Sequence, residues 1–227
     1  MEAMTMCGRF SLATEQSIIE EQFDVLIQEE LSYRYNIAPS QDVFVIGSNG
    51  QDRIGRFMRW GLVPPWSKDL KIGNKMINAR SETIDDKVSF KTPFLKKRCL
   101  IISDGFYEWK RNGKEKHPYR FVMKDRQPFA LAGLWECWNK GDQHLFTCTI
   151  LTTEANKVTE EIHNRMPVIL RKDDFHKWLD PNYHKVRELK SLLVPFDERL
   201  MEAYEVSNLV NSPSNDVKEC LEPINSK

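Results

Sequence analysis

The spacing of hydrophobic residues predicts one helix near the N-terminus and a series of short strands after it. From Glu15 to about Glu30 the apolar residues recur at steps of three and four, which is the period of an amphipathic helix. Beyond this stretch, short apolar or alternating runs are separated by turn-forming sequences such as Ser48-Asn49-Gly50, a pattern typical of strands. The predicted strands are Val43–Ile46, Ile54–Trp60, Cys99–Ser103, Tyr119–Met123, Phe129–Trp135, Leu145–Leu151 and Ala203–Val206.

Three further short helices are predicted at Asn156–Ile162, Asp173–Leu179 and about Tyr183–Leu193. Strands outnumber helices and do not alternate with them strictly. This arrangement predicts an α+β fold: a compact single domain with a curved, mainly antiparallel, β-barrel-like sheet and flanking helices. We place the domain at 7–210, after a leader or prefix at 1–6 that is removed. The polar sequence from 211 to 227 predicts a C-terminal tail.

Composition narrows the class of protein. The chain has 227 residues, 41% of them hydrophobic, which is enough for a sizeable core. Because no apolar run approaches the roughly 18–20 residues of a membrane span and no secretory signal is evident, we expect a cytoplasmic monomer with no membrane partner. The five cysteines are scattered without metal-ligand spacing, so neither a metal nor another cofactor is expected.

The charge is balanced overall but unevenly distributed. Between Arg53 and Arg126 there are nineteen Lys and Arg residues against eight Asp and Glu, and the rest of the chain has fourteen against twenty-five. A basic middle third suits a polyanion such as DNA, but the same pattern also arises on a solvated face that neighbouring acidic residues balance in the fold.

Cys7 offers unusual chemistry if it becomes the first residue of the chain. A first-position cysteine carries an α-amine and a thiol two carbons apart, and together they convert an aldehyde into a five-membered thiazolidine. The α-amine has a reference pKa of about 7.7–8.0, so it is partly neutral at physiological pH. While 1–6 stay attached, this nitrogen belongs to a peptide bond. The alternative role of Cys7 is that of a small, buried apolar residue.

Four segments combine polar residues with apolar strands and contain the other candidates. Glu108, His163 and Asn78 suit proton transfer and hydrogen bonding, but each has an ordinary alternative. Glu108 could be an exposed strand carboxylate, His163 a packed or surface histidine, and Asn78 a turn residue, while Arg80 could pair with Glu82. The segments are Cys7–Phe10, Met76–Thr83, Ser103–Trp109 and Ile162–Pro167.

A proline-stiffened loop with a tryptophan at each end lies within the basic region. In Trp60-Gly61-Leu62-Val63-Pro64-Pro65-Trp66, Trp66 could stack on an unpaired base while Lys68 follows phosphate; Trp60 is expected in the core. The chain has no phosphate-binding loop, dinucleotide fingerprint, zinc-protease motif or nucleophile elbow. Nucleotide hydrolysis, dinucleotide redox chemistry, zinc proteolysis and α/β-hydrolase chemistry are therefore disfavoured.

Six motifs in the same order resemble the SOS-response-associated peptidase (SRAP) family over nearly the whole chain. They are Met-Cys-Gly-Arg-Phe at 6–10, Tyr-Asn-Ile-Ala-Pro at 35–39, Trp-Gly-Leu-Val-Pro at 60–64, Ile-Asn-Ala-Arg-Ser-Glu-Thr at 77–83, Asp-Gly-Phe-Tyr-Glu-Trp at 104–109 and Ile-His-Asn-Arg-Met-Pro at 162–167. The resemblance implies a compact α+β domain that recognises abasic sites in single-stranded DNA. It also implies a covalent thiazolidine to the N-terminal cysteine and a processed prefix, although the family begins at Met-Cys and this chain carries five residues more.

The resemblance further implies a role for each matching residue. Cys7 would be the crosslinking nucleophile, Glu108 the carboxylate that moves protons, and His163 the group that helps to open the sugar. Asn78 would hold the sugar by hydrogen bonds. Three arginines would bind the phosphates that flank the lesion in the DNA strand: Arg9, Arg80 and Arg165. Trp66 and Pro39 would shape the path of this strand across the protein.

Two other classes of function stay open at this point. In the first, Cys7 is the nucleophile of an N-terminal-nucleophile hydrolase or cysteine peptidase, with His163 or Glu108 as its base. In the second, the basic and aromatic surface binds single-stranded DNA without a covalent bond.

Overall fold

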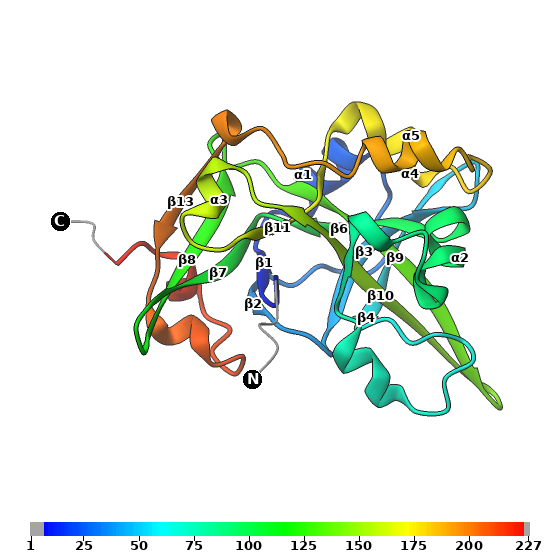
Figure 1. Cartoon of the computed structure of the whole chain (residues 1–227), viewed down its shortest axis with the longest axis horizontal. Coiled ribbons are helices and arrows are strands. Elements are labelled where there is room, and N and C mark those ends of the chain that lie inside the picture. Colours follow the sequence, from blue (N-terminus) through cyan, green and yellow to red (C-terminus); the bar gives the residue numbers. More distant parts are fainter. Residues whose placement is uncertain (1–6, 225–227) are drawn as a thin grey trace.

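The computed structural model describes residues 7–224 and contains two sheets that share one hydrophobic core. The larger, eight-stranded sheet and a second sheet of five strands lie side by side, and the helices lie mainly on the side of the larger sheet (Figure 1). This arrangement confirms the predicted α+β class and the single barrel-like domain. The predicted leader at 1–6 and residues 225–227 lie outside the described residues.

The described residues form the following elements. The strands are β1 (Phe10–Leu12), β2 (Arg34–Ile37), β3 (Asp42–Ser48), β4 (Arg53–Trp60), β5 (Asn78–Arg80), β6 (Arg98–Ser103), β7 (Gly105–Asn112), β8 (Glu115–Met123), β9 (Phe129–Lys140), β10 (Gln143–Glu154), β11 (Arg165–Pro167), β12 (Ile169–Leu170) and β13 (Met201–Glu205). The α-helices are α1 (Gln16–Phe23), α2 (Val88–Lys96), α3 (Lys157–Glu160), α4 (Phe175–Leu179) and α5 (Val186–Ser191).

Five strands of the larger sheet close into a barrel. Around the ring the order is β4-β3-β6-β9-β10, and β10 returns to β4, with Cys148 paired to Trp135 on one side and Trp60 on the other. The β10–β4 pairing is parallel and the other four are antiparallel. The barrel closes because β10 is long enough to pair with several neighbours, including β5 and β11 at its far end.

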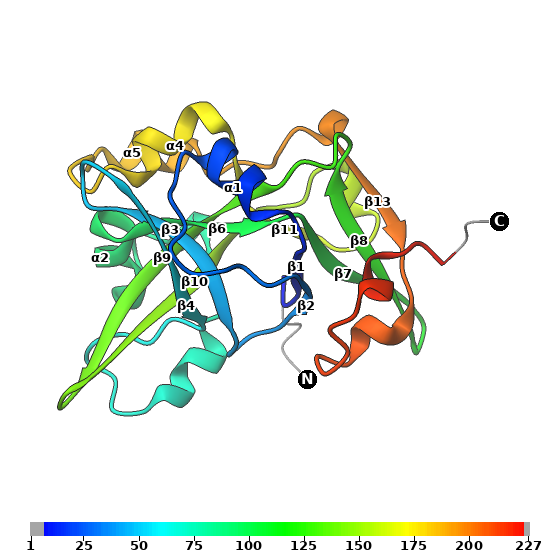
Figure 2. The same cartoon turned by 180° about the vertical axis from the view of Figure 1, so that it is seen from behind.

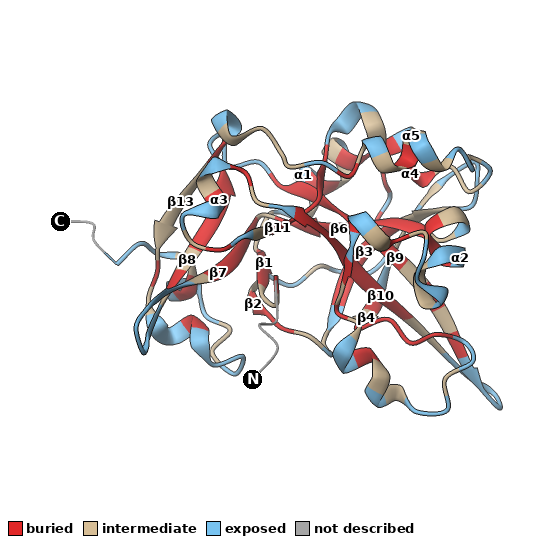
Figure 3. Ribbon diagram, in the orientation of Figure 1, coloured by how far each residue is buried: buried red, intermediate tan, exposed pale blue. Residues whose placement is uncertain are grey.

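The second sheet has the order β13-β8-β7-β1-β2 and includes strands from both ends of the described chain. Its short strand β1 lies next to β7 in the middle of the molecule, as the views from both sides show (Figures 1 and 2). The strands of both sheets are largely buried, whereas exposed residues are concentrated on helices, turns and hairpin tips (Figure 3). β7 directly follows β6 of the barrel in the chain, and β1 contacts β6, so the β1–β7 pair lies at the junction between the barrel and the second sheet.

Most predicted strands coincide with observed ones, but the first helix is much shorter than predicted. The helix ends at Phe23 because Asp24 adopts the left-handed conformation, with φ 49°. After it, Val25 and Ile27 are buried while Leu26 is 77% exposed, which is the alternation of an extended chain. The apolar residues predicted to continue the helix therefore reach the core from an irregular segment.

The segment predicted as a polar C-terminal tail packs against the second sheet as far as Ile224. Asp216 accepts hydrogen bonds from the backbone of Tyr35 and Asn36 and pairs with Arg34, and Cys220 is buried. Many polar residues of this segment thus serve fixed hydrogen bonds. No helix within residues 7–224 is long and apolar enough to cross a membrane.

Candidate functional site

Cys7 and Glu108 meet at the junction of the two sheets. The backbone nitrogen of Cys7 donates a hydrogen bond of 2.6 Å to Oε1 of Glu108, and both residues are only 3% exposed. Glu108 is therefore not an exposed strand carboxylate. The same carboxyl also raises the pKa of the Cys7 thiol, so one carboxylate acts on both the nitrogen and the sulfur of the same residue.

Local backbone geometry brings these two residues together. Phe10 of β1 pairs with Phe106 of β7, and the nitrogen of Tyr107 donates to the carbonyl of Arg9, which extends the ladder towards Cys7. Cys7 itself has a positive φ of 41°, an uncommon conformation for a residue with a side chain. Such strain is found where the surrounding structure enforces it, and it is a common feature of functional sites.

Burial is the main influence on the acidity of both groups. It raises the pKa of the Glu108 carboxyl, while the charge of His163 and the hydrogen bonds from Cys7 act in the opposite direction. Burial likewise raises the pKa of the Cys7 thiol well above its usual range, with Glu108 adding to the effect and Arg165 opposing it. The site therefore favours a neutral thiol. It also moves the pKa of the carboxyl towards neutral pH, where a carboxyl can both take up and release a proton.

His163 belongs to the same cluster. It lies between α3 and β11 and is 7% exposed, and its charge acts on Glu108. The backbone nitrogen of Arg165 donates to its Nδ1 over 3.1 Å. The same Nδ1 lies 3.2 Å from the carbonyl oxygen of Arg165, so the backbone of Arg165 orients the ring in either tautomer.

Asn78 and Arg80 lie on β5, the short strand that pairs in parallel with β10. The Nδ2 of Asn78 is buried and has no hydrogen-bond acceptor among residues 7–224, so it is a donor in reserve. Arg80, at the end of the strand, is exposed. β5 therefore carries two groups at alternate positions, the half-buried amide of Asn78 with its free donor and the exposed guanidinium of Arg80. The strand itself is hydrogen-bonded to β10 of the barrel.

Two of the predicted phosphate-binding arginines already have protein partners. Arg165 pairs with Glu82 through both guanidinium nitrogens and also donates to the carbonyl oxygen of Thr152 over 2.8 Å. The suggested pairing of Glu82 with Arg80 is therefore replaced by an ion pair with Arg165, although the charge of Arg80 also lowers the pKa of Glu82 slightly. The sequence contained no signal for this pair, because its members are 83 residues apart.

Arg9 is held against the C-terminal segment. Its Nη1 donates to Oδ1 of Asn36 over 2.8 Å and to the carbonyl of Val210, and its guanidinium lies 5.7 Å from the ring centroid of Trp109. One face of the guanidinium is thus committed to the protein, while its Nη2 makes no protein hydrogen bond among the described residues.

Trp66 and Pro39 lie in adjoining loops. The loop of Pro39 is hydrogen-bonded to the end of β4, where the nitrogen of Ser40 donates to the carbonyl of Trp60, and the loop that contains Trp66 starts at the next residue. Trp66 is 59% exposed, whereas Trp60 is buried as predicted and donates from its indole nitrogen to Ile77. The described residues contain no cluster of His, Cys, Asp and Glu with the arrangement of a metal site.

Comparison with known proteins identifies the family. The sequence profile described as SOS response associated peptidase (SRAP) matches residues 6–213. The abasic site processing protein YoqW of Bacillus subtilis is 50% identical over 223 residues, which cover 96% of this chain and 99% of that protein. The abasic site processing protein HMCES of Gallus gallus is 38% identical over 202 residues, covering 78% of this chain and 60% of that protein.

The fold agrees with this result. A crystal structure of a Bacteroides thetaiotaomicron protein superposes with a TM-score of 0.88 at 29% identity, over 96% of this chain and the whole of the other. A second structure, from Bordetella bronchiseptica, has a TM-score of 0.71 at 27% identity, over 89% of this chain and 95% of the other. On the profile match and the curated relatives, this chain belongs to the SOS response associated peptidase (SRAP) family.

Proposed function

We propose that this protein processes abasic sites in single-stranded cytoplasmic DNA by forming a covalent thiazolidine between Cys7 and the opened sugar, which shields the lesion during the response to DNA damage. The observation that carries the proposal is the position of the Glu108 carboxylate, which accepts a hydrogen bond from the nitrogen of Cys7 and raises the pKa of its thiol. These are the two atoms that must react with one aldehyde carbon. The relatives named abasic site processing proteins support the choice of substrate.

The reaction requires proton transfers that Glu108 is placed to perform. The neutral α-amine of Cys7 adds to the C1′ aldehyde of the open sugar, and the carbinolamine then loses water when a proton is supplied to its hydroxyl, which leaves an imine. The thiol adds to the imine carbon and its proton passes to nitrogen. Overall, an aldehyde, an amine and a thiol give a thiazolidine and one water. A carboxyl with a raised pKa is suited to act as base in one step and acid in the next.

The other site residues have proposed roles that match their surroundings. Asn78 offers its unused Nδ2 to a sugar oxygen, and His163, as imidazolium, would give a proton to the ring oxygen during opening and become the neutral imidazole. Arg80 is free to bind a phosphate, while Arg9 and Arg165 would do so beside their present partners. Trp66 and Pro39 would guide the strand. Each contact with phosphate makes affinity depend on salt.

The raised pKa of the thiol distinguishes this proposal from a cysteine peptidase acting on other proteins. A peptidase nucleophile works as thiolate, and its pKa is usually lowered by its surroundings. Burial and Glu108 do the opposite to Cys7. The amine, whose nucleophilic form is neutral, therefore suits this site better as the first nucleophile.

We further propose that the chain exposes Cys7 by cleaving its own Met6–Cys7 bond. The thiol of Cys7 would add to the Met6 carbonyl as Glu108 takes its proton; the Cys7 nitrogen would leave as an amine on receiving a proton, and water would hydrolyse the thioester. Glu108→Gln is then expected to keep residues 1–6 in the intact mass, whereas the unaltered chain loses them. Equal loss from both forms would point to another protease.

Intact mass spectrometry tests the main proposal. Protein that begins at Cys7 is mixed with an abasic single-stranded oligonucleotide, and we expect a heat-stable adduct whose mass is the sum of both partners less one water. Cys7→Ala and an oligonucleotide with all its bases are the matched controls, and neither should give this product. Absence of the adduct, together with equal affinity for intact and abasic strands, would favour a non-covalent binding module instead.

A further inference from the structure

The strand that carries Cys7 is held by few backbone hydrogen bonds. β1 has only three residues and pairs with β7 at two positions, Phe10 with Phe106 and Ser11 with Gly105. Its register with β2 shifts between Phe10 and Leu12. Because so short a strand fixes its own position poorly, a displacement of β1 would be passed directly to Cys7, three residues away.

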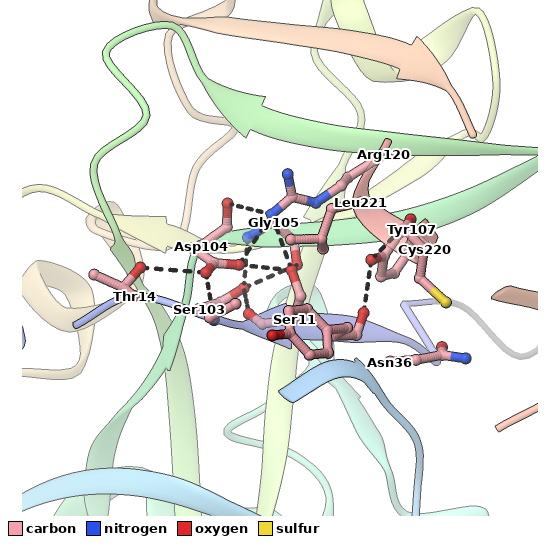
Figure 4. Close-up of polar contacts among 12 residues, drawn as sticks. Ser11, Thr14, Asn36, Ser103, Asp104, Gly105, Tyr107, Arg120, Cys220 and Leu221 are labelled. Carbon is pink, nitrogen blue, oxygen red and sulfur yellow. Dashed lines mark hydrogen bonds and ion pairs between the residues drawn. The ribbon is translucent and has the colours of Figure 1, made fainter. Parts of the chain in front are cut away.

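The side chain of Asp104 attaches β1 to β7 in addition to these backbone hydrogen bonds. This residue immediately precedes β7, and its carboxylate accepts from the hydroxyl of Ser11 over 2.6 Å, from the backbone nitrogen of Ala13, and from the hydroxyl of Thr14 over 3.2 Å. Its backbone nitrogen also donates to the carbonyl of Ser11 over 3.0 Å. Figure 4 shows the Asp104 side chain beside Ser11 and Thr14. A single aspartate thus fastens the end of β1 to the start of β7.

Arg120 of β8 holds this arrangement from the other side. Its Nη2 donates to Oδ1 of Asp104 over 3.0 Å and to the hydroxyl of Ser11 over 3.1 Å (Figure 4). Its Nη1 donates to the hydroxyl of Tyr204 over 2.8 Å. The Asp104 and Arg120 side chains are each 9% exposed. Burial alone would lower the pKa of Arg120, but Asp104 and nearby tyrosines keep it raised, so the guanidinium stays charged.

The glycine after Asp104 is required by the same arrangement. A Cβ atom on Gly105 would lie 2.6 Å from Nε and 2.8 Å from Cζ of Arg120, closer than real Cβ contacts allow. The guanidinium therefore occupies the space where a side chain would be. This close approach explains why a glycine follows Asp104 in the sequence.

We infer that Asp104 and Arg120 are positioning residues for the reaction: by fixing β1 against β7 at Ser11, they set the distance between the Cys7 nitrogen and Glu108. Asp104 lies four residues before Glu108, and Ser11 lies four residues after Cys7. The two antiparallel segments are therefore joined at one end by the carboxylate of Asp104 and meet at the other end in the contact between Cys7 and Glu108. The reaction that this geometry serves is the one proposed above.

Asp104→Asn tests the inference, because it keeps the shape of the side chain and removes its charge. We expect adduct formation to slow by about 10- to 100-fold, the effect of a displacement near 1 Å in a reacting pair. Binding of an undamaged strand should not change, since the pair lies in the interior. Ser11→Ala is a milder second variant, which loses the hydroxyl contacts to Asp104, Arg120 and the carbonyl of Gly105 and should slow the reaction by roughly threefold.

A second measurement does not depend on DNA. Peptide mass spectrometry follows alkylation of Cys7 by iodoacetamide against pH. When β1 moves away from Glu108, the thiol should titrate at a lower pH and react faster at pH 8, whereas a merely stabilising pair would lower the melting temperature without this change. Glu202→Gln, which breaks the exposed pair with Arg126, is the control and should alter neither measurement.

The outcomes separate the two proposals. Unchanged alkylation of Cys7 in both Asp104→Asn and Ser11→Ala, with unchanged adduct formation, overturns the positioning role. Faster alkylation in the variants supports it even if the unaltered protein forms no adduct, a result that would reject the proposed function alone.

Discussion

The barrel and the second sheet compensate their buried charges in different ways. In β6, which belongs to the barrel, Cys99 to Ile102 are all apolar and fully buried. In the second sheet, β1, β2, β7 and β8 bury polar or charged residues, among them Ser11, Asn36, Glu108 and Arg120. Apolar burial stabilises a fold, whereas burial of a charge is costly unless partners compensate it. The barrel also buries charges, but Glu136 pairs with Lys97 and Arg98 donates to backbone carbonyls. Glu108 of the second sheet is in no ion pair among residues 7–224, so this sheet holds its reactive carboxylate at the expense of stability.

The largest expected effect is on the chemistry of the second sheet. Glu108→Gln preserves size but cannot take up or release a proton, and general acid–base catalysis typically contributes about 10²- to 10⁴-fold to a rate. We expect the rate of adduct formation by protein that begins at Cys7, followed on denaturing gels, to fall within this range.

Glu136 provides the matched control, because it is a buried carboxylate in the barrel. It lies on β9, its side chain is 4% exposed, and it pairs with Lys97. Glu136→Gln should leave the rate of adduct formation per folded molecule unchanged. Equal loss of rate in both variants would remove the distinction between the two regions.

The next effect is on the stability of the barrel. Ile101 is fully buried on β6, and truncation of such a side chain to alanine typically costs about 2–5 kcal/mol. Urea denaturation of Ile101→Ala should show a loss of this size, while the folded fraction forms the adduct at the normal rate. A large loss of rate in folded protein would mean that the barrel core also positions the site.

The sequence allowed more to be predicted about the barrel than about the second sheet, and the reason is physical. Strands such as Cys99–Ser103 are buried runs whose composition is enough to identify them, and they coincide with β6. β1 and β2 have only three and four residues, too few to show a period, so their placement depends on tertiary hydrogen bonds that no local pattern encodes. The bend at Asp24 escaped prediction for a similar reason, because a helical period continues through it.

The candidate site shows the same division. Cys7, Glu108 and His163 were proposed from motif resemblance, and the structure brings them together. Glu82 as the partner of Arg165 could not be anticipated, because the contact joins segments 83 residues apart. The sequence alone also gave no reason for Asp104 to bind β1. Motifs thus identified residues, whereas only the fold supplied the contacts between them.

A smaller effect concerns stability against pH. The pKa of Glu108 is raised in the folded state, so the folded protein binds a proton more tightly than the unfolded chain. Its contribution to stability is fully present below the unfolded pKa and is lost as pH rises through the folded pKa. Glu108→Gln, which cannot ionise, should therefore melt higher than the unaltered protein at pH 7.5.

Calorimetric scans between pH 4 and pH 8 check this expectation. The difference in melting temperature should shrink as the pH falls, because the carboxyl of the unaltered protein then becomes neutral. Glu136→Gln is again the control and should lose stability at neutral pH, since it breaks an ion pair with Lys97. A Glu108→Gln variant that is less stable at every pH would show that the carboxylate is fully compensated, and that the second sheet gives up no stability at this residue.

The smallest expected effect concerns the ion pair between Arg165 and Glu82. Arg165 lowers the pKa of Glu82 through a hydrogen bond, so the pair is charged at neutral pH. Glu82 is partly exposed, and such a pair is typically worth about 0.2–1 kcal/mol. Because a DNA phosphate would compete with Glu82 for the guanidinium, Glu82→Gln should raise affinity for an undamaged single strand by roughly two- to fivefold. Fluorescence anisotropy across a salt series should also show a steeper salt dependence, by close to one phosphate contact.

Glu202→Gln removes the same charge from an exposed pair of the second sheet, so an equal gain in both variants would mean that net charge alone is responsible. A gain confined to Glu82→Gln would instead show that a contact within the protein limits how strongly the site binds DNA before the reaction. The edge of the barrel would then hold an ion pair that stabilises the fold and weakens DNA binding, the opposite of the buried Glu108, which favours the reaction and costs stability.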